Sequence, residues 1–152
     1  MNKENRNALD ALLRKNIIFL SGKIDDETVV RIYTCLAILE GRGSPDIEIR
    51  IFTIGGRVRA GLNIYDALRR YKGRKTGVVY SYARSMGAII LQACDERVCL
   101  RHAVLLIHHI HMESIPLDVL ENPRRLEKFR GSMWADQKAL YAILAKRTKR
   151  SE

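Results

Sequence analysis

The chain has 152 residues, of which 47% are hydrophobic and 29% charged, a composition typical of one globular domain rather than of a disordered chain. No apolar run approaches the ~20 residues of a membrane-spanning helix, and residues 1–7 lack the apolar stretch of a signal peptide. The formal net charge of +10 suits a nucleic-acid or anionic-surface binder, but the basic residues are spread along the chain without the interleaved aromatic residues of a base-stacking platform. We therefore expect a solvated basic surface, or contacts with acidic neighbours in an assembly, rather than nucleic-acid binding or a membrane partner.

Strands and helices alternate along the first two thirds of the chain. In chain order, the sequence predicts a helix over 8–14, a strand over 17–20, a helix capped by Asp25 or Asp26 and ended by Gly41 and Gly43, a strand over 46–53, a helix over 58–71, a strand over 76–83, a helix over 86–94, and strands over 97–100 and 103–107. Three isoleucines at positions 47, 49 and 51 share one face of the second strand, and Leu62, Tyr65 and Leu68 or Ala67 are expected to face inward from the helix that follows. This order predicts an α/β fold with a largely parallel sheet covered by helices.

The last third of the chain predicts one long helix over 124–149, after a short connection bracketed by Pro116 and Pro123. Its helical stripe consists of Leu126, Phe129, Met133, Leu140 and Leu144, while Trp134, Tyr141 and Ile143 lie off the stripe. A helix that is apolar on more than one side usually contacts something beyond its own core. We predict an oligomerisation element; the alternative is that the helix only closes the sheet.

Three cysteines, Cys35, Cys94 and Cys99, stand in hydrophobic surroundings, and their spacing does not resemble a zinc site. We expect buried thiols in a reducing compartment, hence a cytoplasmic protein.

Ser85 stands where an apolar strand breaks abruptly into an apolar helix, so it is expected at the end of a strand and at the positive end of a helix dipole. Two further features converge on it: the glycine pair Gly55-Gly56, and His108 at the end of the apolar run 103–107. A hydroxyl, an imidazole and free backbone N–H groups are the parts of a serine hydrolase. We interpret the pattern as an enzyme that cleaves acyl bonds, above all peptides; the alternative is that Ser85 only caps a helix.

His109 and His111 follow closely on His108 and raise the question of a metal site. Strand alternation would place His109 and His111 on one side and His108 on the other, with Glu113 as the nearby carboxylate. Two histidines on one side do not make a metal cluster, so we predict no metal.

These motifs resemble the proteolytic subunit of the Clp protease (ClpP). The resemblance lies in four collinear segments, 16–28, 55–66, 83–88 and 106–108, within a match that runs from about Ala8 to about Thr148. It implies that Ser85 is the nucleophile, that His108 is the general base, and that the N–H groups of Gly56 and Met86 form the oxyanion hole. Such an enzyme requires no cofactor.

The resemblance also implies the fold and the assembly. The fold is a ClpP/crotonase-type repeated ββα superhelix, here a single domain over 1–152 with a head over 8–112 and a handle over 113–150. An extended substrate, a peptide or unfolded protein, pairs by β-addition along Val58 and its neighbours Gly55 and Arg57. The handle stacks two rings of a homo-oligomer back to back, so that the active sites line an internal chamber.

The chain departs from the family pattern in several places. The acidic residue that orients the histidine follows the handle in the family, and this chain ends at Glu152 before that segment, so we expect a truncated chain or an incomplete triad. Loss of that carboxylate alone typically lowers the rate ~10⁴-fold. Thr53-Ile54 replace the usual Ser-Pro, which can alter the turn but leaves both N–H donors. Only residues 1–7 precede the first helix, whereas longer axial loops meet the AAA+ unfoldase in the family, so this partnership is questioned.

Two other functions fit parts of the pattern. A non-catalytic ClpP-like ring subunit would keep the architecture and rely on an active partner. A crotonase-like acyl-thioester enzyme would use paired backbone N–H groups to hold an enolate, but the pairing of Ser85 with His108 disfavours this function.

Overall fold

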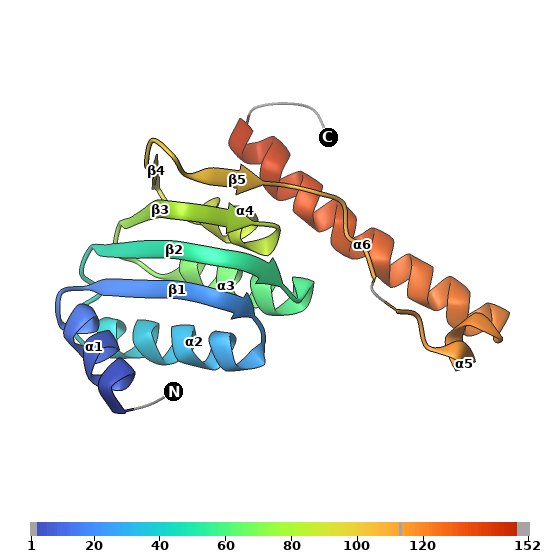
Figure 1. Ribbon diagram of the computed structural model, residues 1–152, viewed down its shortest axis with the longest axis horizontal. Coiled ribbons are helices and arrows are strands. Elements are labelled where there is room, and N and C mark those ends of the chain that lie inside the picture. Colours follow the sequence, from blue (N-terminus) through green and yellow to red (C-terminus); the bar gives the residue numbers. More distant parts are fainter. Residues whose placement is uncertain (1–2, 113, 149–152) are drawn as a thin grey trace. The chain divides into compact units, whose positions relative to one another are not determined.

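The computed structural model describes residues 3–112 and 114–148 (Figure 1). The chain divides into two compact units, Met1–Ile107 and His108–Glu152, and each is described by itself.

The first unit is an α/β fold built on a parallel sheet, as the sequence predicts. Its elements are α1 (Lys3–Arg14), β1 (Ile17–Ile24), α2 (Asp26–Glu40), β2 (Ile47–Gly56), α3 (Val58–Arg70), β3 (Lys75–Arg84), α4 (Met86–Leu91), β4 (Glu96–Cys99) and β5 (Val104–Leu106). The sheet order is β1-β2-β3-β4, and every pairing is parallel. Strand β5 also pairs with β3, at residues 82–84, beyond the stretch 76–79 that pairs with β4.

Helices α2, α3 and α4 come directly after β1, β2 and β3 in the chain and lie on one side of the sheet (Figure 1). The core lies between these helices and the sheet. Ile47, Ile49 and Ile51 of β2 are between 0% and 3% exposed, which confirms their predicted inward face. Alternate residues of the same strand, such as Phe52 and Ile54, are exposed on the other face. The sheet is therefore covered on one face within this unit.

Asp25 is the N-cap of α2, which settles the alternative between Asp25 and Asp26. Its carboxylate accepts hydrogen bonds from the N–H and the hydroxyl of Thr28, both at 3.0 Å. The backbone hydrogen bond is the main cause that lowers the pKa of Asp25 below its ordinary value. The helix ends at Gly41, as predicted.

Several expectations for the first unit are wrong in detail. Leu62 and Tyr65 of α3 are only half-buried, although both were expected to face inward. The reason is that Gly61 of this helix lies against Met86 of α4. The buried residues of α3 are Ala60, Gly61, Ile64 and Leu68. Of the cysteines, Cys94 is buried, Cys35 is half-buried and Cys99 is exposed, because β4 is an edge strand with exposed side chains.

The second unit contains α5 (Leu117–Leu120) and α6 (Pro123–Thr148). The long helix is confirmed; residue 149 of the prediction lies outside the described residues. The Asn122 side chain accepts the N–H groups of Arg124 and Arg125, each at 3.1 Å, at the start of α6. In the described part of the chain, no helix combines the length and apolar character that a membrane span requires.

Candidate active site

Ser85 has an unusual backbone conformation at the junction between β3 and α4. Its φ of 51° lies in the left-handed region that non-glycine residues rarely occupy. Its N–H donates to the carbonyl of Leu106 in β5 at 2.8 Å, and its own carbonyl accepts the N–H of Ala88 at 3.0 Å. Ser85 holds the N-cap position of α4, but its side chain makes no capping hydrogen bond among the described residues.

Gly55 lies directly against Ser85. A Cβ atom added to Gly55 would lie 2.7 Å from the Ser85 Cβ, 2.7 Å from the Arg84 carbonyl oxygen and 3.2 Å from the Met86 nitrogen. The φ of Gly55 is 90°, which a side chain would also oppose. The structure therefore brings together the glycine turn and the serine junction that the sequence singled out.

Gly56 is held equally closely, but against β1. A Cβ at this position would lie 2.2 Å from the carbonyl oxygen of Ile24, and the N–H of Arg57 donates to that same oxygen at 2.8 Å. The backbone around Gly56 is thus fixed by main-chain contacts on the β1 side.

Thr53 is a residue of this site that the sequence analysis did not identify as functional. It is fully buried, at 0% exposed. Its hydroxyl donates to the carbonyl of Gly22 at 2.5 Å and accepts the N–H of Gly55 at 3.1 Å. A threonine two residues before a glycine pair was the available signal.

The start of α4 is packed by small residues. The Met86 side chain is 1% exposed and lies against Gly61, where an added Cβ would come within 2.4 Å of the Met86 Cε. The N–H of Met86 belongs to the first turn of α4, where N–H groups have no acceptor within the helix.

The remaining two candidates for substrate binding, Arg57 and Val58, lie at the beginning of α3. Arg57 is the N-cap residue and forms an ion pair with Asp26. Val58 is the first residue of the helix and is half-buried. The extended backbone of this segment therefore ends at Arg57.

His108 belongs to the second unit, where its ring is exposed. Its Nδ1 lies 2.6 Å from the carbonyl oxygen of His109, and because a carbonyl only accepts, the ring donates through Nδ1–H. In the neutral ring, Nε2 is then the free acceptor.

The other two histidines differ from the expected arrangement. The His111 ring contacts the His108 ring, with 5.1 Å between ring centroids and a tilt of 48°, while His109 Nδ1 lies 2.8 Å from the Tyr141 hydroxyl. Strand alternation fails here because residues 107–112 form no strand. Within residues 3–112 and 114–148, no three His, Cys, Asp or Glu side chains gather as metal ligands.

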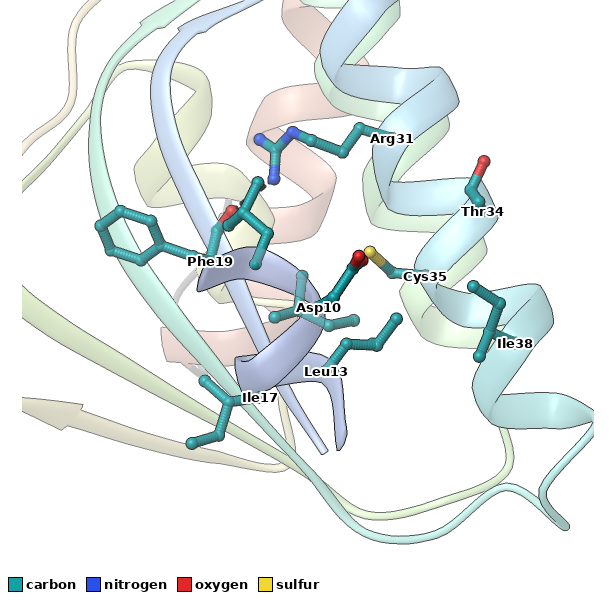
Figure 2. Close-up of a pocket in the computed structure, with 10 residues that line it drawn as sticks. Asp10, Leu13, Ile17, Phe19, Arg31, Thr34, Cys35 and Ile38 are labelled. Carbon is teal, nitrogen blue, oxygen red and sulfur yellow. Dashed lines mark hydrogen bonds between the residues drawn. The ribbon is translucent and has the colours of Figure 1, made fainter. Parts of the chain in front are cut away.

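A hollow of the first unit lies between α1, β1 and α2 (Figure 2). It has a volume of about 190 Å³, and its walls are mainly apolar. Asp10 and Cys35 point toward one another there, and Arg31 donates to the Phe19 carbonyl at 2.5 Å (Figure 2). Burial raises the pKa of the Cys35 thiol, so it is protonated at neutral pH and a poor nucleophile.

Comparison with known proteins gives one consistent result. The model of the Clp protease family matches residues 1–152. The chloroplastic ATP-dependent Clp protease proteolytic subunit 3 of Arabidopsis thaliana is 33% identical over 108 residues, which cover 69% of this chain and 35% of that protein. The matched part of the chain thus spans about a third of the length of this curated relative.

Proposed function

Because the chain belongs to the Clp protease family, we propose that it is a ClpP-type serine endopeptidase, which cleaves peptides or unfolded polypeptides inside an oligomeric chamber. The observation that carries the proposal is the conformation of Ser85. This residue has a positive φ, its side chain makes no capping hydrogen bond among the described residues, and it lies directly against Gly55. Strained backbone of this kind clusters at active sites, where the surrounding structure compensates for it.

In the proposed reaction, the Ser85 Oγ attacks the carbonyl carbon of the scissile peptide while the Nε2 of His108 accepts its proton. The tetrahedral oxyanion is stabilised by the N–H groups of Gly56 and Met86. When this intermediate collapses, the C–N bond breaks and His108 gives the proton to the leaving amine. Water then attacks the acyl-enzyme, with His108 again as base, and releases the acid and free Ser85.

The backbone around the serine supports these oxyanion donors. The N–H of Arg57 faces β1, so strand alternation turns the preceding N–H, that of Gly56, to the opposite side, on which β3 lies. The first-turn N–H of Met86 follows Ser85 directly in the chain. Removal of one such donor from an oxyanion hole costs about 3–4 kcal/mol in the transition state.

The histidine tautomer supports the role of His108 as base. The His109 carbonyl holds the proton on Nδ1, which leaves Nε2 free to accept. His108 also follows Leu106 by two residues in the sequence, and the carbonyl of Leu106 accepts a hydrogen bond from the Ser85 N–H.

The substrate is proposed to lie extended beside the backbone over 55–57, while Val58, the first residue of α3, contributes its side chain to this edge. A peptide added along a strand end gains main-chain hydrogen bonds, while side-chain pockets give specificity. Arg57 and Arg59 stand beside this edge and favour acidic or C-terminal peptide segments.

Exposed apolar surface supports a homo-oligomer of stacked rings. Residues 104–107, at and just beyond β5, are between 41% and 55% exposed, although all four are apolar. Contiguous apolar surface of this kind marks interaction sites. We propose that neighbouring copies cover it within a ring, and that α6 provides the contact between rings.

Two further predictions accompany this function. A cytoplasmic location is checked by cell fractionation. An AAA+ unfoldase as partner is checked by ATP-dependent degradation of a folded substrate.

A fluorophosphonate probe tests the proposed function, because it reacts covalently with an activated serine. We expect the probe to label Ser85 in the assembled full-length protein, Ser85→Ala to abolish labelling, and His108→Ala to slow labelling by about 10²–10⁴-fold. His111→Ala is the matched control, because the His111 ring contacts His108 but has no proposed chemical role.

A non-catalytic ring subunit is the second candidate. It is favoured by the partner of His108 Nδ1, which is a neutral carbonyl and not a carboxylate that would stabilise the imidazolium. Assembled protein that the probe does not label, and that co-purifies with an active homologue, would establish this candidate and eliminate the peptidase.

A further inference from the structure

Thr53 is buried beside the proposed active site, yet the proposed reaction does not use it. Its hydroxyl has one proton and two lone pairs, so it donates to the Gly22 carbonyl, at 2.5 Å, and accepts the Gly55 N–H, at 3.1 Å, at the same time. These two bonds connect the end of β2 to β1 across a shift in register between Gly22 and Lys23. The side chain therefore fixes the turn where the regular pairing of the two strands is interrupted.

The methyl group of Thr53 contacts a different segment. A Cβ added to Gly87 would lie 2.4 Å from the Thr53 Cγ2, so the methyl packs against the backbone of α4 in its first turn. One side chain thus contacts both segments that supply the proposed oxyanion donors. The hydroxyl contacts the Gly55-Gly56 turn, and the methyl contacts the helix that begins at Met86.

We propose that Thr53 is a positioning residue, whose hydroxyl sets the orientation of the Gly56 N–H in the turn beside α4. This inference rests on the proposed function. Because the Thr53 hydroxyl occupies the N–H of Gly55, that group is turned away from a substrate carbonyl, and the next N–H along the chain is the one presented. Displacement of a preorganised donor by about 1 Å can lower a rate about 100-fold. The conformation of the Gly55-Gly56 turn would therefore determine the rate of the proposed reaction.

Thr53→Val and Thr53→Ser form a matched pair for the test. Valine keeps the methyl contact with Gly87 and removes the hydroxyl, whereas serine keeps the hydroxyl and removes the methyl. We expect Thr53→Val to slow fluorophosphonate labelling of Ser85 by about 10- to 100-fold, and Thr53→Ser to stay within about fivefold of the wild type. Peptide hydrolysis should lose kcat with little change in KM, because the donors act on the transition state.

Hydrogen exchange of the full-length protein, followed by mass spectrometry over a peptide that contains Gly55, provides a readout that does not depend on activity. Thr53→Val frees the Gly55 N–H, so its exchange should accelerate at least about tenfold, while Thr53→Ser should preserve the wild-type rate. Unchanged exchange elsewhere in the chain demonstrates that the variant is folded. If Thr53→Val does not fold, Thr53→Ala takes its place against Thr53→Ser.

The outcomes separate this inference from the proposed function. A wild type that the probe does not label contradicts the proposed function and, with it, the role of Thr53 in positioning donors. A labelled wild type with equal labelling in Thr53→Val overturns the positioning role and leaves the peptidase intact. Equal Gly55 exchange in wild type and Thr53→Val also overturns it. Slower labelling together with faster Gly55 exchange in Thr53→Val, and recovery of both in Thr53→Ser, supports it.

Discussion

At the residue scale, the proposed site depends on how closely backbone approaches backbone. Gly55 combines a φ of 90° with a neighbour, Ser85, that would stand 2.7 Å from an added Cβ. Gly43 has a similar φ of 86°, but the described structure places nothing within 4 Å of its added Cβ. Substitution of these two glycines by alanine therefore separates the effect of a positive φ from the effect of steric crowding.

We predict that Gly55→Ala lowers peptide hydrolysis and probe labelling at least about 100-fold, because the backbone of Arg84 and Ser85 must shift to admit the methyl group. Gly43→Ala should destabilise the fold by about 1–2 kcal/mol through its φ alone, and leave labelling within about twofold. Labelling rates and urea denaturation of both variants provide the measurement. Equal loss of labelling in the two variants would contradict the proposed contact between the glycine turn and Ser85.

The sequence alone identified the local parts of this site. Ser85 and the glycine pair stand out because a strand-to-helix junction and a glycine turn are short-range features. Thr53 did not, because its partner Gly22 lies 31 residues away and the register shift that joins them is a tertiary property. The partner of His108 Nδ1 was equally hidden, because the predicted strand ended at residue 107 and the irregular backbone over 107–112 has no sequence pattern that fixes its contacts.

At the element scale, a buried lysine joins the end of α3 to the beginnings of β3 and β4. Lys75 is 5% exposed, and its ammonium donates to the carbonyls of Tyr71 and Gly73 and lies 3.1 Å from the Asp95 carboxylate. Burial acts to raise the pKa of Asp95, but the N–H and the ammonium of Lys75 outweigh it and hold that pKa below its ordinary value. The ionised pair therefore stabilises the folded state.

We predict that Asp95→Asn destabilises the protein by about 1–2 kcal/mol at pH 7, less than for a fully buried pair because the Asp95 side chain is 41% exposed. Since the folded-state pKa is lowered, this contribution is present above about pH 4 and disappears as the pH falls through the folded-state pKa. Urea denaturation at pH 7, 5 and 3 should therefore show a gap between wild type and variant that closes in acid.

Glu96→Gln is the control for this prediction, because the ion pair of Glu96 with Arg74 is exposed and should contribute at most about 0.5 kcal/mol. A gap for Asp95→Asn that stays constant down to pH 3 would contradict the role of the ionised carboxylate.

Element types were predictable, but their ends were not. Hydrophobic periodicity located the strands and helices, and the alternating isoleucines of β2 gave its inward face correctly. Strands β1 and β2 continue beyond their apolar cores because Lys23 and Ile24 pair with Gly55 and Gly56, and such pairing depends on the partner strand. Helix α3 shows the same limitation, since contact with Met86 decides which of its residues face inward.

At the scale of the whole molecule, large apolar side chains remain uncovered in each unit. Trp134 of α6 is 59% exposed, and the apolar β5 is exposed along its length. The sequence indicated an oligomerisation helix because its apolar residues lie on more than one side. It did not indicate the exposure of β5, whose apolar run looked like a core strand.

We predict that Trp134→Ser weakens the proposed contact between rings and lowers the mass of the particle toward that of a single ring. Lys138→Ser, one turn further along the same helix, should leave the particle unchanged. Sedimentation velocity of the two variants against the wild type measures the effect. A Trp134→Ser particle of wild-type mass would exclude this residue from the contact.

The hydrogen bond between the Ser85 N–H and the Leu106 carbonyl has a kinetic consequence. Strand β5 is only three residues long and exposed, so we expect it to open before the longer, buried strands. One fraying event would release the peptide plane of Ser85, the proposed nucleophile, and loosen the chain that leads to His108, the proposed base. The fraction of molecules competent to react would then follow the opening equilibrium of a single short strand, and a ligand or neighbour that clamps this strand would act as an activator without touching either reacting group.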